Sequence, residues 1–158
     1  MFRQMRRARQ ALTREECLDI LTNEKRGVLS LLGDGGYPYG VPLNHFYCPE
    51  DGKIYFHGGK AGHRVDAAKA CGKASYCIFG EGFRAPGDWA LTFRSVIVFG
   101  RLELIEDRET VERISRLLSY KFTQDEDYIS REVASFGAGT LLMALTIEHM
   151  SGKQVHEA

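Results

Sequence analysis

The chain has 158 residues, a length that fits one domain with a core of its own. Hydrophobic residues make up 44% of it, as is typical of globular proteins, and 21 basic side chains balance 21 acidic ones. A net charge of zero argues against nucleic acid or an anionic membrane as the main partner, because both reward a strong basic excess.

No apolar run approaches the roughly 20 residues of a membrane helix. The chain starts with the basic sequence MFRQMRRARQ, and the apolar region of a signal peptide does not follow it. We therefore expect a cytoplasmic protein that forms one domain over residues 1–158, with residues 1–12 as a flexible tail. The four cysteines show no CxxC spacing, so the sequence predicts free thiols and no metal site.

A helix is expected to begin at Thr13, because Thr13 and Glu16 are in capping-box register and an apolar stripe follows. Strands are expected where β-branched and aromatic residues run between turn residues, at Arg26–Leu32, Tyr37–Tyr47, Ile54–His57, Lys73–Gly80, Thr92–Asp107 and Thr140–Lys153. Further helices are expected at Gly62–Cys71, Glu109–Tyr120 and Asp125–Ala134.

Two residues within the expected strands favour local irregularity. Pro42 indicates an edge strand, a bulge or a place where a ligand meets the backbone, and Gly100 indicates a bulge. Strands joined mostly by tight turns give an antiparallel sheet, and about six strands with long members favour closure into a barrel. These patterns leave a barrel or a sandwich open.

The segment Lys53–Ala70 carries the clearest functional signal. A short strand runs into Gly58 and Gly59, and the following helix has Lys60, His63 and Arg64 at its start. Cations at a helix N-terminus oppose the helix dipole unless an anion lies among them, and such an end with glycines nearby is suited to phosphate. The segment therefore predicts a grip on a phosphorylated cofactor; the alternative is a solvated basic turn.

Two strand histidines need separate interpretations. His57 follows Phe56, so it lies on the opposite sheet face together with Tyr55, where it is either a functional group or a polar interface residue. For His45 the sequence favours a surface strand residue.

Several segments together resemble a known superfamily: RGVLSLLGDGGYPYGVPLN, then GKIYFHGGKAGHRVDAAK, then RSVIVFGRLELIED, then LTIEHMSGKQ. Their order resembles the flavin-binding split β-barrel superfamily typified by pyridoxamine 5'-phosphate oxidase, and within it the nitroimidazole-resistance branch. The resemblance covers most of the chain from Arg26 to Lys153. It implies a six-stranded antiparallel split β-barrel with flanking helices, and a homodimer with two FMN molecules at the subunit interface.

The resemblance also implies roles for individual residues. Val41, Pro42, Leu43 and Asn44 would line the isoalloxazine ring. Phe56 and His57 would lie beside that ring, with His57 as the catalytic candidate. Lys60, His63 and Arg64 would hold the phosphate, and Ser95 would add a hydroxyl from the neighbouring strand.

The function that follows is an FMN-dependent oxidoreductase that reduces a small acceptor such as a nitroaromatic or a quinone. A reduced nicotinamide is a candidate donor, and it would bind transiently because the sequence has no Rossmann fingerprint. Two alternatives stay open: a flavin-binding module without turnover, such as a carrier or redox sensor, and a barrel that binds haem through an axial histidine.

Overall fold

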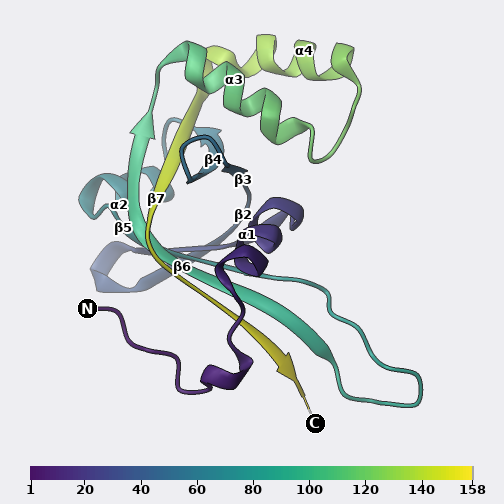
Figure 1. Cartoon of the computed structure of the whole chain (residues 1–158). Helices are drawn as coiled ribbons and strands as arrows, with labels where there is room; N and C mark the ends of the chain where they lie inside the picture. The colour runs from purple at the N-terminus through teal and green to yellow at the C-terminus, as the bar shows by residue number, and fades with distance from the viewer. Residues whose placement is uncertain (158) are drawn as a thin grey trace.

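The computed structural model describes residues 1–157, and its centre is a curled antiparallel sheet (Figure 1). The seven strands have the order β2-β1-β5-β6-β7-β4-β3. Their bounds are β1 Arg26–Leu32, β2 Pro38–Asn44, β3 Phe46–Cys48, β4 Lys53–Gly59, β5 Lys73–Phe79, β6 Thr92–Ile105 and β7 Thr140–His156. The helices are α1 Arg14–Asn23, α2 His63–Ala70, α3 Arg108–Ser119 and α4 Glu126–Phe136.

The mainly β architecture with flanking helices confirms the split-barrel prediction, but the prediction of six strands is wrong. The expected strand Tyr37–Tyr47 is two strands, β2 and β3, because the chain breaks at His45. Pro42 lies on β2, which is an edge strand of the sheet, as one of the three interpretations of this proline predicted. An edge strand has no neighbour on its outer side, so a residue without an N–H is tolerated there. The predicted irregularity at Gly100 is confirmed by a register shift between Phe99 and Gly100.

His45 is fully buried, so its interpretation as a surface residue was wrong. Its ring Nε2 lies 2.7 Å from the Leu21 carbonyl oxygen, and its Nδ1 lies 2.9 Å from the Tyr76 hydroxyl. A neutral ring with its proton on Nε2 satisfies both contacts, by donating to Leu21 and accepting from Tyr76. Burial, with a smaller contribution from the Lys121 charge, lowers the pKa of His45 to about 4.

We expect this histidine to make the fold acid-sensitive. An unfolded imidazole has a pKa near 6.5 and His45 in the folded chain near 4, so the unfolded state binds more protons between these values. The contribution of His45 to the free energy of unfolding is therefore fully present above pH 6.5 and is lost as the pH falls toward 4. At pH 5 the loss is about 2 kcal/mol. Urea unfolding at several pH values measures this loss. His45→Gln, which cannot titrate, should lack this part of the pH dependence, and an unchanged dependence would contradict the prediction.

The first helix and the barrel interior form one core. The capping box of α1 is confirmed, with the Thr13 backbone N–H 2.8 Å from a Glu16 carboxylate oxygen and the Glu16 N–H 3.2 Å from the Thr13 hydroxyl. Cys17, Ile20 and Leu21 of this helix pack into the cluster that fills the barrel. Among residues 1–157, no helix is long and apolar enough to span a membrane.

The last two helices form a hairpin at one end of the sheet (Figure 1). Val111 and Ile114 of α3 pack with Tyr55 of β4 and Leu142 of β7 in a second apolar cluster, outside the barrel. The Arg116 guanidinium lies 3.0 Å from the Glu126 carboxylate, which ties α3 to α4. This hairpin therefore covers the outer face of β4 and β7.

The N-terminal segment lies along the outer face of β6 and β7 at the other end of the sheet. Phe2 stacks on His149 at 4.8 Å between ring centroids and lies 5.6 Å from the Phe99 ring. The Leu12 backbone N–H donates to the Gly152 carbonyl at 3.0 Å. Residues 1–12, expected as a flexible tail, thus run from the outer face of the long strands at Phe2 to the edge of β7, where Ala11 bridges to Lys153 and Leu12 packs against the core.

Candidate functional site

The end of β4 places His57 on the outer face of the sheet. Phe56 points into the barrel, where its ring meets the Tyr76 ring edge-on at 4.8 Å. Tyr55 and His57 share the opposite face, as the alternation predicted, with Tyr55 buried under α3 and His57 exposed at the edge of a cavity. Only the backbone of Phe56 is therefore available to a molecule bound beside His57.

The start of α2 has two features that suit a bound anion. Its N-cap is Gly62, at a φ of 115° that disfavours other residues, and no side chain caps the helix. A helix end without a cap leaves backbone N–H groups available to a bound ligand. Lys60 next to this end is exposed and lies 3.9 Å from the Glu106 carboxylate, a weak surface pair.

Arg64, in the first turn of α2, is a half-buried cation. Its guanidinium folds over Gly58, so close that a Cβ at Gly58 would overlap it. Arg64 is half-buried, yet its side chain has no hydrogen bond or ion pair with any of residues 1–157. Burial lowers the pKa of Arg64, although a guanidinium stays charged at neutral pH. A half-buried cation without a partner fits a site for a ligand anion.

His63 connects α2 to the turn between β1 and β2. Its ring stacks on Tyr39 with 4.1 Å between centroids, and its Nε2 accepts the Asp34 backbone N–H at 3.3 Å. The same nitrogen lies 3.8 Å from an Asp34 carboxylate oxygen, so both contacts tie His63 to this turn. Of the three residues expected at the phosphate, His63 therefore makes the closest contacts with other groups, whereas Lys60 has only its weak pair with Glu106.

The predicted ring-lining residues lie on the edge strand β2. Val41 and Leu43 pack against the barrel core, whereas Pro42 is exposed. Asn44 ends the strand, accepts a hydrogen bond from Arg26 Nε at 3.0 Å and borders the same cavity as His57. The structure thus brings Asn44 and His57 together from strands at different places in the sheet.

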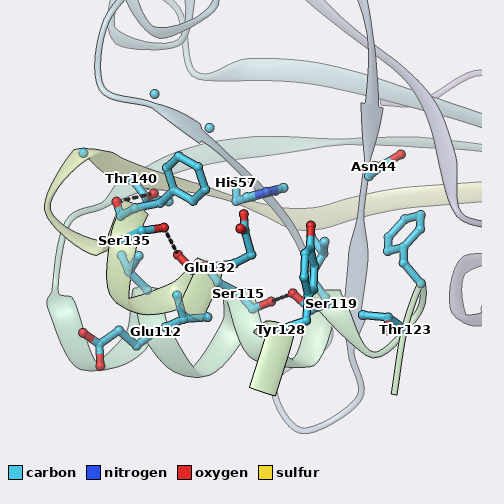
Figure 2. Close-up of a pocket in the computed structure, with 18 residues that line it drawn as sticks. Asn44, His57, Glu112, Ser115, Ser119, Thr123, Tyr128, Glu132, Ser135 and Thr140 are labelled. Atoms are coloured by element: carbon cyan, nitrogen blue, oxygen red, sulfur yellow. Dashed lines mark hydrogen bonds between the residues drawn. The ribbon is translucent and has the colours of Figure 1, made fainter. Parts of the chain in front are cut away.

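A cavity of about 570 Å³ lies between these residues and the α3–α4 hairpin (Figure 2). Apolar side chains of the hairpin form most of its wall: Val111, Leu118, Phe122, Tyr128, Val133 and Phe136. The pKa of His57 is lowered, mainly because the surrounding protein removes water from the imidazole and to a smaller extent because of the Arg64 charge. At neutral pH the cavity therefore has a neutral imidazole at one side.

The hairpin residues that line the cavity, including Ser115 and Glu132, were not predicted from the sequence. The signal was present in α3, where Val111, Ile114 and Leu118 form the apolar stripe and Ser115 occupies a position on that stripe. A serine on the buried face of a helix could have drawn attention to this surface. That the hairpin packs on β4 could not be predicted from the sequence, because the two segments are far apart in the chain.

Ser95 lies far from this group within one chain. It pairs with Lys153 on β7, whereas His57 pairs with Leu142, eleven positions earlier on the same strand. At about 3.3 Å per residue this is roughly 36 Å along the strand. Ser95 instead borders a second cavity, with N-terminal residues and His149.

The chain was compared with known proteins. The sequence model of the pyridoxamine 5'-phosphate oxidase family matches residues 13–154. No curated protein sequence matches the chain.

Similar solved structures share its fold. A candidate 5-nitroimidazole antibiotic resistance protein from Bacteroides thetaiotaomicron is 18% identical, with a TM-score of 0.75 over 92% of this chain and 87% of that one. A FAD-binding protein from Mesorhizobium loti is 24% identical, with a TM-score of 0.65 over 92% and 97%. A FAD and haem binding protein from Mycobacterium smegmatis is 22% identical, with a TM-score of 0.71 over 94% and 74%.

Proposed function

Since the chain belongs to the pyridoxamine 5'-phosphate oxidase family, we propose that it is an FMN-dependent oxidoreductase that reduces a small acceptor such as a nitroaromatic or a quinone. The observation that carries the proposal is Arg64, a half-buried guanidinium at an uncapped helix end that has no hydrogen bond or ion pair with any of residues 1–157. Structural neighbours that bind FAD and one that is a candidate nitroimidazole resistance protein support a flavin and this class of acceptor.

The residues around Arg64 suit FMN in particular. The Arg64 fork and the Lys60 ammonium would bind the phosphate, together with backbone N–H groups at the start of α2. Val41, Pro42, Leu43 and Asn44 would face the ring, and His63 would support the phosphate through its place between Tyr39 and Asp34. The flavin would supply electron transfer between donor and acceptor, while this chain supplies position, charge and exclusion of water.

His57 would act on the acceptor. In quinone reduction, a reduced nicotinamide loses two electrons and a proton as hydride, and the acceptor gains two electrons and two protons. The second proton comes from solvent, and a neutral His57 can donate a hydrogen bond to the acceptor oxygen and relay that proton. Its lowered pKa favours this neutral form at pH 7.

The absorption spectrum of the purified protein and a turnover assay test the proposal. We expect the bands of an oxidised flavin, and oxidation of a reduced nicotinamide that depends on added nitroaromatic or quinone. A haem spectrum without flavin bands would contradict FMN as the cofactor. If flavin is bound but no combination of nicotinamide with a nitroaromatic or a quinone is turned over, the proposed oxidoreductase activity is contradicted. A flavin carrier or redox sensor would then be favoured.

We also propose that the functional unit is a homodimer with FMN at the subunit interface. Ser95 is too far from His57 to join the site of its own chain, so its predicted role needs a second copy. Ile97 and Phe99 on the same face of β6 stay 40% and 39% exposed even with the N-terminal segment in place. Exposed apolar side chains on a long strand suit an interface between two copies.

Light scattering at micromolar concentration should therefore give twice the mass of one chain. Ile97→Lys places a charge in the proposed interface and should give monomers that bind FMN more weakly. Ala134→Lys makes the same change in charge on an exposed part of α4 and should leave the dimer intact. Wild-type monomers with FMN still bound would contradict the shared site.

For the compartment we propose the cytoplasm. All four cysteines are free thiols, and Cys17 and Cys48 are buried. Free thiols in these numbers suit a reducing environment.

A further inference from the structure

One hydroxyl beside the cavity has no partner in the fold. Ser115 lies on the apolar face of α3, and its Oγ has almost no solvent-exposed surface. This oxygen has no hydrogen bond with any of residues 1–157, although the Ser115 backbone carbonyl accepts one from the Ser119 hydroxyl at 2.8 Å. Burying an unpaired hydroxyl is unfavourable, and Ser115 borders the cavity, so a turn of this side chain toward the cavity would let a ligand provide the missing partner.

Glu132 gives the cavity a second polar group without a partner. Figure 2 shows its side chain directed from α4 toward the part of the cavity where His57 lies. Two other carboxylates of the hairpin helices are paired, Glu112 with Arg108 at 2.7 Å and Glu126 with Arg116 at 3.0 Å. In the described part of the chain no cation lies within 4.0 Å of Glu132, although it is only partly exposed.

The rest of the wall is aromatic at its exposed side. Phe122, Tyr128 and Phe136 border the cavity and remain 40%, 47% and 60% exposed. A carboxylate together with aromatic faces is the environment that binds an organic cation. The positive groups of the site, Lys60 and Arg64, belong to the loop and helix after β4, whereas Glu132 belongs to the hairpin. The positive and the negative charge of the site therefore come from different elements of the fold.

We propose that this cavity is the acceptor site and that it selects small aromatic acceptors that carry an ammonium or similar cationic group. Glu132 binds the cation, the aromatic side chains cover the ring, and Ser115 hydrogen-bonds a polar substituent on it. That the ligand is an electron acceptor rests on the proposed function, whereas the preference for a cation rests on the cavity itself.

Two probes with the same nitroaromatic ring test the preference: 4-nitrobenzylammonium and 4-nitrobenzoate. Their affinities for the FMN-loaded full chain are measured by calorimetry without a reductant, and their turnover is measured separately. We expect the wild type to bind the ammonium probe at least about tenfold more tightly than the benzoate. Glu132→Gln should reduce this ratio to near one, and Ser115→Ala should weaken both probes several-fold.

Glu112→Gln is the matched control. Glu112 also borders the cavity, but Arg108 holds its carboxylate and Figure 2 shows that carboxylate directed away from His57, so the ratio should not change. A wild type without preference, or a preference that survives Glu132→Gln, would overturn the proposal. Loss of FMN from Ser115→Ala or Glu132→Gln would also overturn it, because the cavity would then hold the cofactor.

The two proposals fail in different ways. A clear preference in binding without turnover of either probe supports the cation site and contradicts the oxidoreductase. Turnover of both probes with equal affinities supports the oxidoreductase and contradicts the cation site.

Discussion

Replacing Arg64 with alanine should weaken FMN binding by about 1.5–3 kcal/mol, the range for hydrogen bonds to a charged group. The half-buried guanidinium has no partner among residues 1–157, so its loss removes a phosphate contact without breaking an ion pair of the fold. Riboflavin, which lacks the phosphate, should bind the wild type far more weakly than FMN and should be little affected by the substitution. Fluorescence titration measures both ligands, and equal affinities in the wild type would refute the phosphate grip.

Gly58 allows a sharper form of the same test. A Cβ at Gly58 would overlap only the far end of the Arg64 side chain, which is flexible, so Gly58→Ala should fold but displace the guanidinium. We expect it to weaken FMN binding toward the level of Arg64→Ala. In the Arg64→Ala background the same change should have little further effect, because the group that it displaces is absent. Additive losses would show that Gly58 acts through another contact.

His57→Ala should lower turnover by roughly a hundredfold or more while FMN stays bound, because general acid–base groups contribute about 10²–10⁴-fold. His57 borders the cavity and makes no hydrogen bond with the described residues, so its removal should leave the fold intact. Stopped-flow or steady-state rates with a nitroaromatic or quinone measure the effect. If FMN affinity or dimer mass falls instead, His57 is a binding or interface residue, and if neither changes it has no role in the site.

The pH profile separates two roles for this histidine. Burial, and to a smaller extent the Arg64 charge, lower the pKa of His57 from 6.5. A neutral imidazole that donates a hydrogen bond is therefore lost only as the pH falls through this lowered pKa, and turnover should fall with it. A protonated imidazole as the acid would give the opposite slope. Because the fold itself loses stability in the same range through His45, circular dichroism must show that the chain stays folded at each pH.

The features predicted correctly from sequence depend on residues that are close in the chain. The capping box at Thr13 and Glu16 and the strand Arg26–Leu32 follow from local propensity, and the irregularity at Gly100 follows from a glycine within a strand. His45 shows the limit of such patterns. Its partners Leu21 and Tyr76 lie 24 and 31 residues away, so a polar residue in an alternating strand gave no sign of a buried hydrogen-bonded position.

The site divides in the same way. The glycines and cations from Gly58 to Arg64 are neighbours in sequence, so their clustering could be predicted, and their role at a phosphate stays a prediction. The cavity could not be predicted, because it forms only where the hairpin packs on β4 through contacts such as Tyr55 with Val111. Ser115 and Glu132 line a cavity only because of that packing.

The position of the hairpin in the chain also bears on how such proteins diversify. The long strands β6 and β7 remain paired up to Ile105 and Leu142, and both helices of the hairpin lie between these two points. An insertion closed by a firm strand pair can change in length or sequence at small entropic cost. Substitutions in the hairpin can therefore alter the wall of the cavity while β2, β4 and α2, where we propose that the cofactor binds, stay unchanged.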